Sequence, residues 1–353
     1  MLLTHMNNPQ STQNLVFYRK YRPQKFDEII GQENTVKILK NAIKENRLAH
    51  AYLFAGPRGT GKTTIARILA REAGCAEEDI VEIDAASSRG IDEARALREA
   101  AHVLPMRSAH KIYIIDEVHM LTKEAFNALL KILEEPPKHT IFILATTELS
   151  KVPETVVSRT QRFEFSKISI PDILKELNII AKAENIKAED DALKLVAFFA
   201  DGSLRDAENI FFQITSAGEK IVKEEDVRLL LGAPKEEDVN NILKFVFEKN
   251  AAELIKTLDD VLEEGRDPSL ILRLLLRSFR AIYFLAVDAK IESVLAHEFS
   301  DDEIVLLRTF AQKGAKAAEF AFREVLDASR VKTDDYTASY PLELALIRIA
   351  TNQ

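Results

Sequence analysis

The chain has 353 residues, of which 46% are hydrophobic and 29% charged, and its 48 Lys and Arg against 56 Asp and Glu give a net charge of −8. This composition predicts two or three domains with hydrophobic cores and excludes a largely disordered chain. No apolar run approaches the roughly 20 residues needed to cross a bilayer, the polar N-terminus has no signal-peptide core, and a single cysteine excludes both an internal disulfide framework and a multi-cysteine zinc site.

Charge is divided unevenly between the two halves of the chain. Residues 1–167 carry a net charge of +3, and residues 168–353 carry a net charge of −11. The acidic total argues against indiscriminate nucleic-acid binding, because affinity for phosphates depends on clustered cations. It leaves room for a basic surface on the first half, especially in an assembly.

Three domains are predicted along the chain after a disordered tail at 1–14, which is rich in Asn, Gln, Thr and Ser. From 15 to 167, short apolar runs alternate with amphipathic patterns, which is typical of an α/β domain with a parallel sheet. No strand is expected after 166. A small helical domain is predicted at 168–233 and an all-α domain at 234–353, divided by the Gly-Ala-Pro break at 232–234. In the first domain the expected strands are 51–55, 80–84, 111–116, 141–145 and 162–165, and the expected helices are 32–45, 62–74, 91–103 and 122–134.

A phosphate-binding loop is predicted where the first strand meets the next helix. The stretch GPRGTGKT at 56–63 fits G-x-x-x-x-G-K-[ST] and has the strand before it and the helix after it that this motif requires. Backbone N–H groups and the helix N-terminus would surround a phosphate, while Lys62 would reach the β/γ-phosphates and Thr63 would ligate Mg²⁺. The alternative is a glycine-rich turn that binds nothing. The expected nucleotide-binding residues here are Gly56, Pro57, Arg58, Gly59, Thr60, Gly61, Lys62, Thr63 and Thr64.

A second half of this site is predicted at the end of the strand KIYIIDE, residues 111–117. Asp116 would emerge at the carboxyl edge of the sheet beside the loop and help to hold Mg²⁺. Glu117 would orient and polarise an attacking water. Apolar strands also end in acidic turns without any such role, so the interpretation depends on the pairing with the loop 54 residues earlier.

Several further motifs occur in a fixed order and carry a family resemblance. They are YRKYRP at 18–23 with Phe26, Gly31 and Gln32, DEVHML at 116–121, FNALLK at 126–131, LEEPP at 133–137, ATT at 145–147, SR at 158–159 and DGSLRDA at 201–207. This series resembles the AAA+ clamp loader ATPases, in particular the gamma/tau subunits of bacterial DNA polymerase III. The resemblance covers about residues 18 to 207, and the helical remainder is compatible but less specific.

The resemblance implies an AAA+ P-loop NTPase domain at 15–167, a helical lid at 168–233 and a collar for oligomerisation at 234–353. It implies a Mg²⁺-dependent ATPase motor that opens a sliding clamp and loads it on primed DNA, with hydrolysis triggered by DNA. The implied partners are the delta and delta-prime loader subunits, further copies of the chain, the clamp and primed DNA, with no membrane. The sequence lacks the tau extension, so either the short form or a truncated piece of the longer form is expected, and the lone cysteine fits a cytoplasmic protein.

Three residues take roles in ATP hydrolysis by this resemblance. Thr147 matches sensor 1, which contacts the γ-phosphate; otherwise it packs at a strand end. Arg159 matches the arginine finger that acts on ATP held by a neighbouring subunit; otherwise it forms a surface salt bridge. Arg205 matches sensor 2, which couples nucleotide state to domain angle; otherwise it pairs with Asp206 or Glu208 on its own helix.

The N-terminal box would contact the nucleoside by the same resemblance, with Tyr18, Arg22 and Pro23 against the adenine and ribose. The alternative is that Tyr18 and Tyr21 are ordinary core aromatics, which we favour for Tyr21.

The chain also departs from the family pattern. Thr160 stands where the family usually has Cys, which leaves the Arg159 guanidinium unchanged. The four-cysteine zinc module common in the family is missing, because Cys75 is followed directly by Ala76 and the strand at 80. We therefore expect no zinc and an inert thiol at Cys75.

A DNA contact is a further possibility at Ser88 and Arg89, just before the helix at 91, because hydroxyls, Arg and helix N-termini suit phosphates. The equal alternative is a Ser N-cap with a solvated Arg. The histidines, including His119 and His139, lack metal-ligand spacing and are interpreted as structural or surface groups.

Two other functions remain open. One is a non-hydrolysing structural loader subunit like delta-prime, against which the complete set of Lys62, Thr63, Asp116 and Glu117 argues. The other is a different AAA+ protein, such as a replication factor C small subunit or a branch-migration motor.

Overall fold

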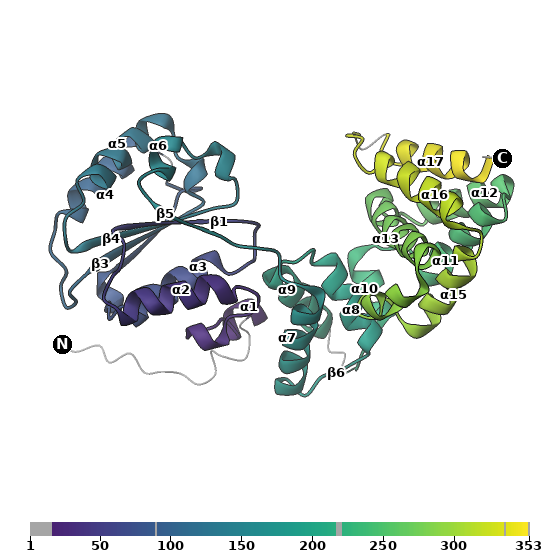
Figure 1. Cartoon of the computed structure of the whole chain (residues 1–353), viewed down its shortest axis with the longest axis horizontal. Coiled ribbons are helices and arrows are strands. Elements are labelled where there is room, and N and C mark those ends of the chain that lie inside the picture. The colour runs from purple at the N-terminus through teal and green to yellow at the C-terminus, as the bar shows by residue number, and fades with distance from the viewer. Residues whose placement is uncertain (1–15, 89, 217–220, 335–336, 352–353) are drawn as a thin grey trace. The chain divides into compact units, whose positions relative to one another are not determined.

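The computed structural model describes residues 16–88, 90–216, 221–334 and 337–351 (Figure 1). The predicted tail at 1–14 lies outside these residues. The chain forms two compact units: Met1–Ile180 with Ala200–Asn209, and Ala181–Phe199 with Ile210–Gln353. Two helices, α7 (Ile170–Ala183) and α9 (Leu204–Ser216), begin in the first unit and end in the second. The boundaries predicted at 167 and 233 remain predictions.

A parallel five-stranded sheet in the order β2-β3-β4-β1-β5 forms the centre of the first unit. Its strands are β1 (Ala51–Ala55), β2 (Ile80–Asp84), β3 (Lys111–Asp116), β4 (Thr140–Thr146) and β5 (Gln161–Glu164). Every strand pairs in parallel with its neighbours. The predicted parallel α/β sheet is confirmed, with strand ends within one residue of those expected.

Helices cover both faces of this sheet (Figure 1). On one face, α2 (Glu33–Lys44) and α3 (Lys62–Glu72) pack on alternate strand residues such as Tyr52 and Phe54. On the other, α4 (Ile91–Ala101), α5 (Lys123–Glu134) and α6 (Glu154–Val157) pack on the residues between them, such as Leu53. Because successive strand residues point to opposite faces, burial on both sides produces the continuous apolar runs in the sequence.

Short elements complete the first unit: the helix α1 (Phe17–Lys20) and the 3₁₀ turns η2 (Phe26–Glu28), η3 (Glu77–Asp79), η4 (Val118–Met120) and η5 (Leu149–Lys151). Asp79 is fully buried, and its carboxylate accepts backbone hydrogen bonds from Met106, Arg107 and Ser108 at 2.5–2.8 Å. These bonds lower the pKa of Asp79 to about 2, although burial acts in the opposite direction. One carboxylate therefore holds the loop that leads into β3.

The second unit is mainly helical, with α8, α10–α17, the turn η6 and one small sheet. A two-residue parallel pair, β6 (Lys187–Ala188) with β7 (Ile221–Val222), contradicts the expectation of no strand after 166. Strands of two residues are too short to produce an alternating pattern. The other elements are α8 (Asp190–Phe199), α10 (Glu224–Leu231), α11 (Glu236–Phe247), α12 (Ala251–Glu263), α13 (Pro268–Val287), η6 (Ala289–Ile291), α14 (Glu292–Leu295), α15 (Asp301–Ala311), α16 (Ala315–Ala328) and α17 (Tyr340–Thr351).

The longest helix of the second unit, α13, begins at an N-cap where Asp267 accepts from the Ser269 N–H and Pro268 takes the first helical position. Within it, Arg277 is 7% exposed, and its guanidinium lies 3.8 Å from the Phe299 ring centroid and 3.8 Å from a carboxylate oxygen of Glu303. Over the residues that the structure describes, α13 and every other helix are too short or too polar to span a membrane.

Candidate nucleotide-binding site

The loop between β1 and α3 has a backbone that glycine alone accommodates. Gly59 has φ +73°, and an added Cβ would lie 1.9 Å from Ser203 Oγ. At Gly56 an added Cβ would lie 2.3 Å from the Phe165 carbonyl oxygen. The loop is therefore fixed between β5 and the start of α9, where the Leu204 N–H donates to the Gly59 carbonyl at 3.1 Å.

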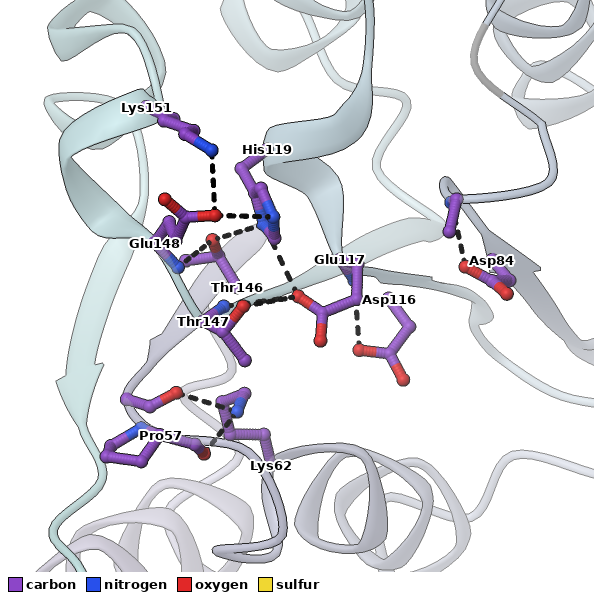
Figure 2. Close-up of polar contacts among 12 residues, drawn as sticks. Pro57, Lys62, Asp84, Asp116, Glu117, His119, Thr146, Thr147, Glu148 and Lys151 are labelled. Atoms are coloured by element: carbon purple, nitrogen blue, oxygen red, sulfur yellow. Dashed lines mark hydrogen bonds and ion pairs between the residues drawn. The ribbon is translucent and has the colours of Figure 1, made fainter. Parts of the chain in front are cut away.

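Lys62 is buried inside this loop, with 6% of its surface exposed. Its ammonium donates to the carbonyls of Gly56 at 2.8 Å and Pro57 at 2.7 Å (Figure 2). Burial lowers the pKa of Lys62, while the carboxylates of Glu117 and Asp116 act in the opposite direction. Among the described residues, the only hydrogen-bond partners of this ammonium are these backbone oxygens, so it can turn towards a bound anion.

Thr63 and Asp116 lie side by side, as predicted for a pair of metal ligands. Thr63 Oγ1 donates to Asp116 Oδ2 at 2.8 Å, and the Glu117 N–H donates to the other carboxylate oxygen at 3.0 Å. A hydroxyl and a carboxylate in contact beside a phosphate-binding loop fit Mg²⁺, which is held in proteins by one or two such ligands plus phosphate oxygens and water. The donor set therefore suits the predicted ion.

Glu117 has a left-handed backbone, with φ 47° and ψ 45°. Its carboxylate Oε2 accepts hydrogen bonds from Thr147 N at 3.2 Å and Thr147 Oγ1 at 3.0 Å (Figure 2). Two residues predicted independently, 30 positions apart, are thus in direct contact. Non-glycine residues in this backbone region are rare and strained, and they cluster at functional sites.

A cavity of about 500 Å³ connects these groups with the N-terminal box and with the first turns of α9. Arg205 lies over the Tyr18 ring, with its Cζ 4.7 Å from the ring centroid. The predicted residues that line the cavity are Tyr18, Arg22, Pro23, Arg58, Gly59, Thr60, Gly61, Lys62, Thr63, Thr64, Asp116, Glu117 and Arg205. Tyr21, interpreted as a core aromatic, is only half-buried and lines the cavity as well.

Glu208, considered from the sequence only as a possible partner of Arg205, is a buried acid in the wall of this cavity with 6% of its surface exposed. Burial raises the pKa of Glu208 to about 8, the nearby Glu176 carboxylate raises it further, and Arg22 opposes both. Glu208 follows Arg205 by three positions in α9, so both occupy one helix face. That spacing was the available signal.

His119, interpreted as a structural or surface group, is buried and lies against the predicted residue Glu117. Its side chain is only 5% exposed, and its Nδ1 lies 3.0 Å from Thr146 Oγ1 and 3.3 Å from Glu117 Oε2. Proximity to Glu117 in the sequence was the available signal. His139, in contrast, bonds the Ala101 carbonyl at 3.1 Å, at the other end of β4.

Arg159 is not among the described residues that line the cavity. Its guanidinium donates to the Thr155 carbonyl at 2.8 Å and to Glu134 Oε1 at 2.8 Å, and the side chain is 36% exposed. The geometry is that of a surface ion pair, which contributes little to stability. Its action on a neighbouring subunit's nucleotide stays a prediction.

Of the two DNA-contact candidates, Ser88 is not among the described residues that line the cavity. Arg89 is not among the described residues. Ser88 is half-buried, and its N–H bonds the Asp84 carbonyl at 3.0 Å. The alternative of a serine N-cap is wrong, because Gly90 is the N-cap of α4.

Cys75 is buried, and its thiol donates to the His110 carbonyl at 3.2 Å. Burial raises the pKa of this thiol, which makes it a poor nucleophile and metal ligand. Across the described ranges, no group of three or more His, Cys, Asp or Glu could hold a metal. The expectation of no zinc stays a prediction.

Three family models match successive parts of the chain. The DNA polymerase III delta subunit model matches residues 31–90 and 77–169, the clamp loader ATPase lid model matches 172–220, and the model of domain III of the gamma and tau subunits matches 222–352. Together they extend over the α/β domain, the lid and the C-terminal helices.

Curated relatives agree with these matches. DNA polymerase III subunit tau of Bacillus subtilis is 38% identical over 331 residues, which cover 88% of this chain and 58% of that protein. DNA polymerase III subunit gamma of Buchnera aphidicola is 34% identical over 310 residues, which cover 82% of this chain and 85% of that protein. The chain thus spans little more than half of the tau relative and most of the gamma relative.

A solved structure supports the AAA+ fold. The Thermotoga maritima RuvB Holliday junction branch migration motor aligns with a TM-score of 0.51 and 24% identity, covering 65% of this chain and 80% of that one. This likeness establishes the fold alone. The sequence identity to the gamma relative over most of its length establishes more: the chain belongs to the gamma/tau family of DNA polymerase III subunits.

Proposed function

We propose that the chain is the ATP-hydrolysing motor subunit of a bacterial replicative clamp loader. The observation that carries this proposal is that Lys62, Thr63, Asp116 and Glu117 line one cavity, with Thr63 bonded to Asp116 and Glu117 bonded to Thr147. A structural subunit that does not hydrolyse ATP would not need the carboxylates of Asp116 and Glu117. Family membership supplies the setting.

Different residues of the cavity would have different roles in phosphoryl transfer. Backbone N–H groups of the loop and Lys62 would bind the β- and γ-phosphates, and the Lys62 ammonium would exchange its two carbonyl contacts for phosphate oxygens. Thr63 and Asp116 would hold Mg²⁺, which neutralises charge on the transferred group. Glu117 would accept a hydrogen bond from the attacking water, because a carboxylate beside the γ-phosphate can orient and polarise it.

Two arginines and the N-terminal box would complete the site. Arg205 would contact the phosphates from the start of α9, and Tyr18, Arg22 and Pro23 would lie against the nucleoside. Arg159 would act on ATP in a neighbouring subunit, since its own chain keeps it on a different surface, paired with Glu134. Hydrolysis would then depend on assembly.

The proposed assembly contains delta and delta-prime subunits, further copies of this chain, the sliding clamp and primed DNA in the cytoplasm. ATP binding would open the clamp and DNA-triggered hydrolysis would release it, with residues 168–233 acting as the lid and 234–353 as the collar. Ser88 and Arg89 remain candidates for contact with the DNA backbone.

The test is ATP turnover by the chain assembled with its delta and delta-prime partners, measured with clamp and primed DNA together and separately. A large stimulation by both together is expected. In the same assay Glu117→Gln should keep ATP binding and lose turnover. Turnover that ignores clamp and DNA would contradict the loader function, and normal turnover by the Gln variant would remove Glu117 from its assigned role.

A further inference from the structure

This inference rests on the proposed function and concerns how the Glu117 carboxylate is oriented. Its two oxygens have different surroundings. Oε2 accepts both the N–H and the hydroxyl of Thr147 and lies 3.3 Å from His119 Nδ1. Oε1 makes no hydrogen bond within the described part of the chain, and the side chain is 30% exposed. One oxygen is therefore held against the end of β4, and the other faces the cavity.

The His119 ring is placed to donate to the held oxygen. Its side chain is 5% exposed, in the 3₁₀ turn η4 that directly follows Glu117. Since an ionised carboxylate can only accept, a contact between Nδ1 and Glu117 requires the hydrogen on Nδ1. Thr146 Oγ1 lies 3.0 Å from the same nitrogen and can share that hydrogen.

Further residues at the end of β4 lie on the other side of this ring (Figure 2). His119 Nε2 lies 3.5 Å from Glu148 Oε1, which accepts from Lys151 Nζ at 2.8 Å. The Glu148 N–H also donates to Thr146 Oγ1 at 3.0 Å. The ring therefore lies between Thr146 and Glu148 at the end of β4, and turning it would break the Nδ1 contact with Thr146 Oγ1.

We propose that His119 is a positioning residue, which together with Thr147 holds Oε2 of Glu117 so that Oε1 faces the attacking water. The strained backbone at Glu117 supports this assignment, because φ 47° places its carboxylate in one direction at a steric cost. Without the imidazole, the carboxylate keeps its charge and its place in the chain but gains rotational freedom. The chemical step should then slow while nucleotide binding stays the same.

Three substitutions at position 119 distinguish the contribution of Nδ1 from that of Nε2. His119→Asn keeps a nitrogen near the position of Nδ1, His119→Gln keeps one near Nε2, and His119→Ala keeps neither. His139→Asn is a matched control, because His139 is also part-buried but bonds the Ala101 carbonyl at the opposite end of β4.

The experiment measures kcat and KM for ATP with the purified chain, assembled with its loader partners. We expect His119→Ala and His119→Gln to lower kcat by about ten- to a hundredfold, the usual effect of removing a group that orients a reacting one, with KM unchanged. His119→Asn should restore most of kcat, and His139→Asn should match wild type. Unchanged kcat in His119→Ala, or an Asn variant as slow as the Ala variant, would overturn the proposal.

A second measurement separates this inference from the proposed function. A wild-type assembly that binds ATP without hydrolysing it would contradict the motor function alone. The contact itself is then decided by a double-mutant cycle of His119→Ala and Glu117→Gln in the free energy of unfolding. A coupling energy different from zero is expected, and strictly additive effects would overturn the positioning role.

Discussion

Glu208 offers a quantitative test of the electrostatics of the nucleotide cavity. Its folded-state pKa is about 8, against an ordinary value of 4.5, because the carboxyl is buried near Glu176. Between these two values the unfolded chain releases the proton and the folded chain retains it. The free energy of unfolding should therefore fall as pH rises from 4.5 to 8 and level off above that range.

The size of the effect follows from the width of this interval. From the unfolded-state pKa of 4.5 up to pH 7 is about 2.5 pH units. At 1.36 kcal/mol per unit, Glu208 lowers the free energy of unfolding at pH 7 by about 3 kcal/mol. Glu208→Gln has nearly the same shape but cannot ionise. We expect the variant to exceed wild type by about 3 kcal/mol at pH 7 and to match it near pH 4.

The assay is urea denaturation followed by circular dichroism at several values between pH 4 and pH 9, with the m-value compared at each pH. Glu124→Gln, at an exposed position on α5, is the control and should leave the pH dependence of wild type unchanged. Parallel curves for wild type and Glu208→Gln, or a variant less stable than wild type at pH 7, would refute the argument.

Three further predictions concern other parts of the first unit. The Asp79 carboxylate stabilises the fold above about pH 4, and this stabilisation is lost as pH falls through about 2. Asp79→Asn removes it, so acid unfolding followed by circular dichroism should begin at a higher pH in the variant than in wild type. Acid transitions at the same pH in both proteins would contradict this. Arg159→Ala should keep ATP binding but lower the turnover of the assembled loader by about a thousandfold, the usual effect of losing an arginine finger; unchanged turnover would leave only its surface ion pair. Gly59→Ala should abolish ATP binding in equilibrium titrations, because the added methyl would collide with Ser203, and wild-type affinity would show that the loop can move aside.

The sequence predicted the sheet well, because strands buried on both faces appear as short apolar runs between helical patterns. It also predicted the glycine-rich loop between β1 and α3 and the position of Asp116 beside it, since spacing and flanking elements define them locally. The contact between Glu117 and Thr147 could not be predicted from the sequence, because it depends on how β3 and β4 pair. Each residue could be assigned a role, but not a partner.

Buried polar residues were the main omission. Glu208 and His119 are buried, although glutamates are mostly exposed in proteins and histidines are intermediate in burial. Arg277, 7% exposed in the middle of α13, is a third case. Hydrophobic periodicity locates the core by its apolar residues, so it gives no indication of a charged group that the fold encloses.

The left-handed backbone at Glu117 sets stability against activity at a single position. Glycine would relieve a steric cost of about 1 kcal/mol there and would remove the carboxylate at the same time. If Glu117 orients water as we propose, selection for thermostability alone would favour a variant without this carboxylate, whereas selection for turnover would maintain a residue that the local backbone disfavours. In a family member that no longer hydrolyses ATP, we expect this position to be among the first to change to glycine.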